Sequence, residues 1–153
     1  MTVWVFVQAA ANEKGLGARI LDLLDERKIT LFVSKLILAE VRYVLGRPDV
    51  RASLRKLTDI AVEALFERLA ERATLIRQVP KRFVYRRDPK DEPYINLAVA
   101  MKADYLVSRD NDLLDLMKWE TEEGRKFQKR FRFLKIVTPE AFLAEIESRI
   151  EQP

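Results

Sequence analysis

Short apolar runs alternate with longer segments of helical periodicity along this chain, and no other feature constrains its fold as much. The runs are rich in β-branched and aromatic residues and predict buried strands at 2–7, 29–33, 103–108 and 133–137, with an edge strand at 74–79. Helical patterns separate them at 18–27, 35–45, 49–57, 59–72, 92–102, 112–117 and 139–150. Strands that alternate with helices form βαβ units. We therefore predict an α/β fold with a mostly parallel sheet of four to five strands and helices on both faces.

Polar residues mark the starts of three of these helices. Ser34 and Thr58 are placed as N-caps, and Thr138 is followed by Pro139, which suits the first position of a helix. The chain has 153 residues and shows neither an internal repeat nor a linker, so we predict one domain that spans residues 1–153.

The absence of cysteine and histidine narrows the chemistry that the chain can perform. It excludes disulfides, thiolate and imidazole metal sites, and Ser-His or Cys-His catalysis. A metal site would have to use oxygen ligands, which favour Mg²⁺ or Mn²⁺ over zinc. The net charge of +4 is in keeping with a polyanionic partner.

Nothing in the sequence indicates a membrane. No apolar run reaches the roughly 18 residues that a spanning helix needs. The apolar N-terminus lacks the basic residues that open a signal peptide. We therefore expect a cytoplasmic protein without a membrane partner.

Acidic residues gather at the ends of the predicted elements. Asp91 begins the helix that precedes strand 103–108, and Asp110 lies two residues past that strand. Glu40 lies in the second turn of the helix that follows strand 29–33, about 7 Å along its axis at about 1.5 Å per residue. All three positions belong to the carboxyl edge of the sheet, where open α/β sheets bind ligands.

Each acid also has a purely structural interpretation. Asp91 could be an N-cap, and Asp110 and Asp112 could be turn and cap residues. Glu40 could pair with Arg42 or Arg47. Taken together these interpretations weaken, because three unrelated helix ends bring acids to one edge. Clustered carboxylates repel one another and cost stability unless a cation neutralises them.

Three segments of the chain resemble the PIN domain. They are SKLILAEVRYVL (34–45), RRDPKDEPYINLAVAMKADYLVSRDNDLLDL (86–116) and IVTPEAFL (136–143), and the second is the most specific. More narrowly, they resemble the PIN-type ribonucleases of bacterial toxin–antitoxin systems. The resemblance covers about residues 18–143 and implies a three-layer α/β/α fold.

The resemblance also implies a metal-dependent ribonuclease that uses Mg²⁺ or Mn²⁺. Glu40, Asp91 and Asp110 stand at the positions of its catalytic and metal-binding acids, and Asp112 is a neighbouring metal ligand. The metal would activate a water that attacks a phosphodiester.

Nucleic-acid contacts are implied around the same edge. Ser108 and Asn111 would be supporting polar groups of the nucleic-acid site, and Arg86 and Arg87 would hold the RNA backbone. The basic stretch 125–132 is a further candidate, although a charged run of this kind is also typical of a solvated surface. The resemblance adds RNA, an antitoxin protein and a second copy of the chain as expected partners.

The chain departs from the family in its first block, which usually is a strand that ends in an aspartate, the core metal ligand. If 2–7 is the first strand, the place of this acid falls at positions 7–8. If the spacing to the following helix is used, it falls at positions 1–2 and the first strand is absent. Neither register contains an acid, and Glu13 is the one acid nearby. A start assigned downstream of the natural one, an altered sequence or a naturally inactive member would each explain this.

Three functions therefore stand as hypotheses. The first is a metal-dependent ribonuclease, the toxin of a toxin–antitoxin pair. The second is a catalytically impaired PIN-like module that binds RNA or a protein partner. The third is an α/β domain of another function, such as nucleotide binding. It ranks last because the chain has no glycine-rich phosphate loop.

Overall fold

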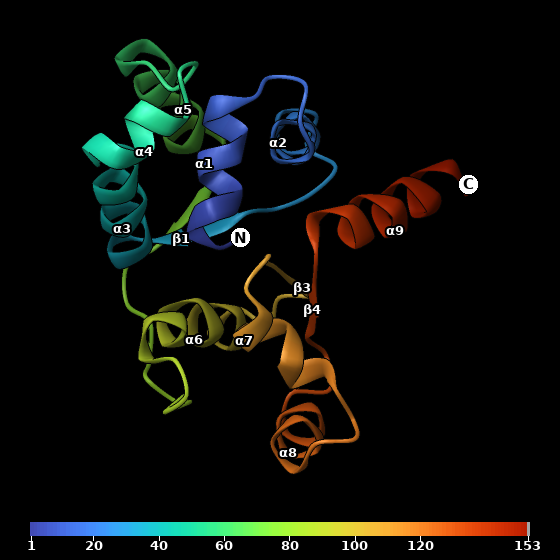
Figure 1. Ribbon diagram of the computed structural model, residues 1–153. Coiled ribbons are helices and arrows are strands. Elements are labelled where there is room, and N and C mark those ends of the chain that lie inside the picture. The colour runs from blue at the N-terminus through green and yellow to red at the C-terminus, as the bar shows by residue number, and fades with distance from the viewer. Residues whose placement is uncertain (153) are drawn as a thin grey trace. The chain divides into compact units, whose positions relative to one another are not determined.

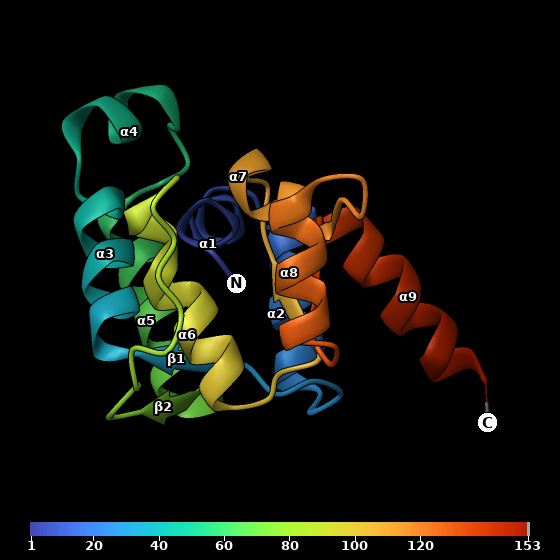
Figure 2. The same ribbon diagram turned by 90° about the horizontal axis from the view of Figure 1, so that it is seen from below.

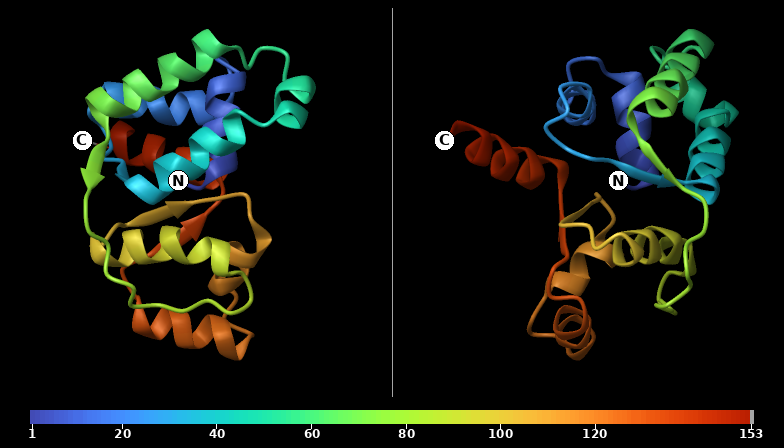
Figure 3. Two further views of the ribbon diagram at one scale, coloured as in Figure 1. Left: turned by 90° about the vertical axis from the view of Figure 1, so that its left-hand side faces the viewer. Right: turned by 180° about the vertical axis from the view of Figure 1, so that it is seen from behind.

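The structure is a computed structural model that describes residues 1–152, and the chain divides into two compact units. The N-terminal unit consists of residues 3–77. The C-terminal unit consists of residues 1–2 together with residues 78–152. Figures 1, 2 and 3 show the elements of each unit.

The N-terminal unit is mainly helical around one pair of short strands. Its elements are α1 (Val3–Ala11), α2 (Leu16–Asp25), β1 (Phe32–Ser34), α3 (Lys35–Leu45), α4 (Pro48–Ser53), α5 (Asp59–Arg72) and β2 (Thr74–Ile76). Strands β1 and β2 are parallel, with Val33 opposite Leu75 (Figure 2). The core of this unit is built around α1, which contacts α2, α3 and α5.

The predicted strand at 2–7 is wrong, because residues 3–11 form helix α1. Val5, Phe6 and Val7 are three consecutive residues with 0% of their surface exposed. A short run of apolar residues fits a buried strand and a buried helix equally well by periodicity. Helices around α1 cover it on several sides, and this packing overrides the β-propensity of valine and phenylalanine.

Replacing Gly17 by alanine tests the packing of α1 against α2. A Cβ at Gly17 would lie 2.8 Å from the Val5 carbonyl oxygen and 2.9 Å from the Ala9 nitrogen, both on the backbone of α1. We expect Gly17→Ala to lower the free energy of unfolding by about 1–3 kcal/mol in urea denaturation, because the backbone must shift. Gly46→Ala is the control, because the nearest atom there is 3.4 Å away. Equal effects of the two variants would contradict the packing.

The C-terminal unit holds a second parallel strand pair with helices around it. Its elements are η1 (Pro89–Asp91), α6 (Glu92–Ala100), β3 (Tyr105–Val107), α7 (Asn111–Leu114), η2 (Asp115–Met117), α8 (Glu122–Arg130), β4 (Lys135–Val137) and α9 (Pro139–Glu151). Strands β3 and β4 can be followed in Figure 3, with Leu106 opposite Ile136. Helices α6 and α9 both contact β3, so the strand end that carries the acids is held within a packed core.

The sheet is less continuous than we predicted. Among the described residues the strands form two separate parallel pairs, β1 with β2 and β3 with β4, and each strand has three residues. These pairings support the α/β class and the parallel direction, but they do not show one sheet of four to five strands. The helix at 3–11 removes one of the predicted strands.

The predicted caps are confirmed. The side chain of Ser34 accepts a hydrogen bond from the Ile37 N–H at 3.2 Å, and Thr58 and Thr138 cap α5 and α9 in the same way. The basic stretch after residue 118, for which we predicted no regular element, contains α8, which buries Phe127.

Candidate metal centre

Three carboxylates of the C-terminal unit lie close enough together to share one cation. Asp88, Asp110 and Asp112 each offer an oxygen, and these oxygens all lie within 4.8 Å of one another. Asp88 precedes η1 and accepts a hydrogen bond from the Lys90 N–H at 3.2 Å. Asp110 and Asp112 stand at the start of α7, just past the end of β3. Two of the three acids of this group therefore lie just past the carboxyl end of β3.

Asp110 is held in place by a short chain of hydrogen bonds. Its Oδ1 accepts from the Asp112 N–H at 2.9 Å, so it caps α7. Its own N–H donates to the Ser108 Oγ at 3.0 Å, and the Thr2 hydroxyl donates to the same Oγ at 3.0 Å. The predicted cap role of Asp110 is thus confirmed.

Asp91 is buried beside this group. Its side chain belongs to a residue only 6% exposed, and within the described part of the chain its Oδ2 has no hydrogen-bond partner. Burial, together with the neighbouring carboxylates of Asp110 and Asp88, raises the pKa of Asp91 to about 8. Asp91 occupies the N-cap position of α6, but its side chain makes no capping hydrogen bond there. The unpartnered Oδ2 of this buried side chain is an oxygen that a cation would stabilise.

Arg87 and Tyr85 fasten the other side of the cluster. Arg87 donates to Asp112 at 2.7 Å and to Asp115 at 2.6 Å, and these contacts raise its pKa. The Tyr85 hydroxyl donates to the backbone carbonyl of Asp112. Burial raises the pKa of this hydroxyl well above its ordinary value, so it stays a donor. Arg87 therefore already neutralises one oxygen of Asp112.

The donor set fits a hard divalent cation. It consists of carboxylate oxygens, one of them a buried oxygen without a partner, and the chain has no thiolate or imidazole to add. Oxygen-only sets of this kind suit Mg²⁺ or Mn²⁺.

The predicted metal ligands lie in both compact units. Asp91, Asp110 and Asp112 come together in the C-terminal unit. Glu40 lies in the second turn of α3 in the N-terminal unit, where it is partly buried, and its role as a ligand stays a prediction.

The predicted nucleic-acid residues differ in access. Arg86 and Asn111 are exposed, whereas Ser108 is 0% exposed and acts from beneath the cluster through Asp110. Arg87 is exposed but committed to two aspartates.

Asp88 is the member of the acidic group that we did not select from the sequence. Asp88 and Asp91 flank Pro89 and Lys90 at a spacing of three, which a 3₁₀ turn brings to one side. This spacing in the sequence could have indicated that Asp88 lies beside Asp91. It was not used, because an Asp-Pro pair is also typical of the start of an ordinary turn.

Helix α1 decides between the two positions at which the family's first aspartate was expected. Because residues 3–11 are helical, the register at positions 7–8 is wrong, and positions 1–2 remain. The Thr2 N–H donates to the Val107 carbonyl at 3.0 Å, so this position lies at the carboxyl end of β3. Threonine there supports Ser108 but offers no carboxylate.

Similarity to known proteins extends over most of the chain. The model of the PIN domain family matches residues 3–112, a range that includes residues of both compact units. An uncharacterized protein of Methanocaldococcus jannaschii is 30% identical over 147 residues, which are 95% of this chain and 89% of that protein. No solved structure matches the chain. Among the described residues, no helix is both long and apolar enough to span a membrane.

Proposed function

The chain belongs to the PIN domain family, whose members are generally metal-dependent nucleases, and on this premise we propose that it is a ribonuclease that hydrolyses phosphodiester bonds within RNA. One observation carries the proposal. Three carboxylate oxygens lie within 4.8 Å of one another, with the buried and unpaired Oδ2 of Asp91 beside them.

The acids of the C-terminal unit would hold Mg²⁺ or Mn²⁺. Asp88, Asp91 and Asp110 are the main ligands that we propose, with the second oxygen of Asp112 and, from the resemblance, Glu40. When bound, the metal supplies an activated water and stabilises the charge that develops on the phosphate.

The surrounding residues position these acids. Ser108 fixes the backbone of Asp110, and Arg87 balances the charge of Asp112 and Asp115. Arg86, which is exposed, is placed to contact the RNA backbone, and Asn111 is exposed at the start of α7.

The wider biological role is also a proposal. The resemblance to toxin-like PIN proteins supports a role as a toxin whose activity an antitoxin protein inhibits. The toxin would act in the cytoplasm and form a dimer with a second copy of itself. The family match includes residues of both compact units, which supports a single domain. We propose that the two strand pairs belong to the three-layer α/β/α sandwich expected of that domain.

A catalytically impaired RNA-binding module is the second candidate function. Positions 1–2 carry no acid, and Arg87 already occupies part of Asp112. Both features weaken the cation site but leave exposed basic residues such as Arg86 in place. In this case RNA would bind in a salt-sensitive way and remain uncut.

Incubation of purified protein with labelled single-stranded RNA tests the proposal. We expect cleavage fragments with Mg²⁺ or Mn²⁺ and none after chelation by EDTA. Intact RNA with both metals, across several RNA sequences, would rule out the ribonuclease. If the same protein still binds RNA in a salt-sensitive way, the impaired module is the function that remains.

A further inference from the structure

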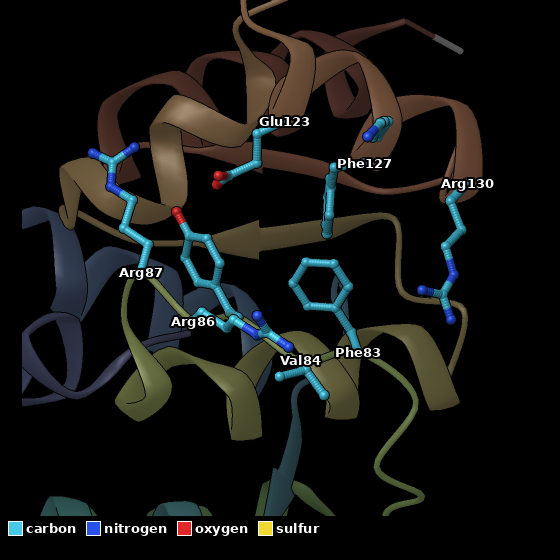
Figure 4. Close-up of a pocket in the computed structure, with 9 residues that line it drawn as sticks. Phe83, Val84, Arg86, Arg87, Glu123, Phe127 and Arg130 are labelled. Carbon is cyan, nitrogen blue, oxygen red and sulfur yellow. The ribbon is translucent and has the colours of Figure 1, made fainter.

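A pocket of about 490 Å³ opens in the C-terminal unit between the loop of residues 83–87 and helix α8. In Figure 4 the rings of Phe83 and Phe127 lie between Arg87 on one side and Arg130 on the other. The centroids of the two rings are 5.2 Å apart, edge to face. The volume of the pocket falls within the range of roughly 300–1,000 Å³ that is typical of small-ligand sites. We call it the Phe83 pocket.

Both walls of the Phe83 pocket are fixed by hydrogen bonds. On the loop side, the side chain of Asn96 accepts from the N–H groups of Arg82 and Phe83, and Glu92 accepts from the Tyr85 N–H at 2.9 Å. On the helix side, Thr121 caps α8 and Phe127 is buried. The pocket is therefore preorganised.

The rim of the Phe83 pocket is strongly basic. Arg86, Arg87, Lys126 and Arg130 line it, against a single acid, Glu123. Arg86, Lys126 and Arg130 are exposed, and the ion pair of Lys126 with Glu122 lies at the surface. Aromatic faces and cations together are the chemistry of single-stranded nucleic acid sites, where bases stack and phosphates meet basic side chains.

The Phe83 pocket adjoins the acidic cluster through shared residues. Tyr85 and Arg87 line the pocket, and both contact Asp112, by the Tyr85 hydroxyl and by an ion pair of 2.7 Å. An RNA strand whose phosphate lies at the carboxylates would therefore lead a neighbouring nucleotide towards Phe83.

We propose that the Phe83 pocket binds a nucleotide of single-stranded RNA that flanks the scissile phosphate. The base packs against Phe83, and phosphates contact Arg86, Lys126 and Arg130. This inference rests on the proposed ribonuclease function and gives its substrate class. Helix α8 lies beyond the family-matched residues 3–112, so the α8 wall of the pocket comes from outside the matched range.

Single-stranded rather than duplex RNA follows from the aromatic wall. In a duplex the bases are stacked on one another, so their faces are closed to protein rings. The pocket would accept a base only from an unpaired strand, whereas the basic rim alone would hold either form.

A double charge variant tests the rim. Binding of a short labelled single-stranded RNA is measured by fluorescence anisotropy in EDTA, which separates binding from cleavage. We expect Lys126→Gln with Arg130→Gln to weaken binding about tenfold and to lower the salt slope by about 1.4, the value for two lost phosphate contacts. The matched control is Lys129→Gln with Arg132→Gln, two exposed residues that do not line the pocket. Equal losses in both double variants would overturn the assignment to the pocket.

The role of the aromatic wall in binding bases can be tested on the wild-type protein, so that no substitution disturbs the fold. We expect it to bind an intact strand about five- to a hundredfold more tightly than an abasic strand of the same length, and to prefer single strands to duplexes. Phe83→Leu, checked by thermal melting, should reduce this preference. Equal affinity for intact and abasic strands would overturn the proposal.

The cleavage assay keeps the two proposals apart. Cleavage together with equal affinity for intact and abasic strands leaves the ribonuclease standing and removes the pocket. Base-dependent binding without cleavage supports the pocket as an RNA site and removes the ribonuclease.

Discussion

Replacing Asp110 by asparagine is expected to lower the rate of RNA cleavage at least a hundredfold and to abolish stabilisation by Mn²⁺. Asp110 belongs to the cluster of three carboxylates within 4.8 Å, and an amide cannot supply its negative charge to a cation. Changes in the second shell of metal sites alone cost roughly 10–100-fold, so the loss of a direct ligand should cost more. Rates are measured on labelled single-stranded RNA with excess metal.

The fold should survive the Asp110→Asn change, which makes the result specific. Asparagine is as good an N-cap as aspartate, so the bond from the Asp112 N–H is kept. Wild-type protein should gain about 2.7 kcal/mol at a metal concentration a hundred times Kd, seen as a higher Tm, while the variant gains little. Asp104→Asn removes an exposed carboxyl before β3 and serves as the matched control. Full cleavage by Asp110→Asn would contradict the site.

Metal-free protein is expected to lose stability as the pH rises from about 4 to about 8. Burial and the nearby carboxylates raise the pKa of Asp91 from 3.8 to about 8. Between these values the folded state keeps a proton that the unfolded state has released, so stability falls as the pH rises. We expect a loss of up to about 1.4 kcal/mol per pH unit within this window, measured by urea denaturation in EDTA.

Replacing Asp91 by asparagine separates this effect from other titrations. The neutral amide has no charge to bury, so metal-free Asp91→Asn should be more stable than the wild type at pH 8 and nearly equal to it at pH 4. Addition of Mn²⁺ should reverse the order, because the wild-type carboxylate then has a partner. The same pH dependence in wild type and variant would show that Asp91 does not carry the effect.

Local chemistry made much of the fold predictable. Helices α3 and α5 have the predicted bounds, because Ser34 and Thr58 start them and their apolar periodicity runs unbroken to the end. The strand before Asp110 and the helix after Asp91 were also placed within a few residues. The acids of the C-terminal unit could be predicted to meet because a parallel αβ unit brings a helix start to a strand end.

Several features depended on packing between distant segments. Residues 3–11 are helical because helices α2, α3 and α5 pack around them. The local sequence pattern does not indicate this packing. Asp88 joins the cluster through a 3₁₀ turn, and Arg87 reaches Asp112 and Asp115 from a loop. A sequence shows charged residues but not which of them are committed to one another.

Composition alone limits the chemistry of a metal site in this chain. Without cysteine or histidine, only oxygen ligands were available, and their positions at strand and helix ends follow from the alternating pattern. Only the tertiary structure decided the state of each acid. Asp91 is buried with an oxygen that lacks a partner, whereas Asp112 is already paired with Arg87. This difference arises because burial and ion pairing depend on which segments pack together, and they set the free energy of each charge.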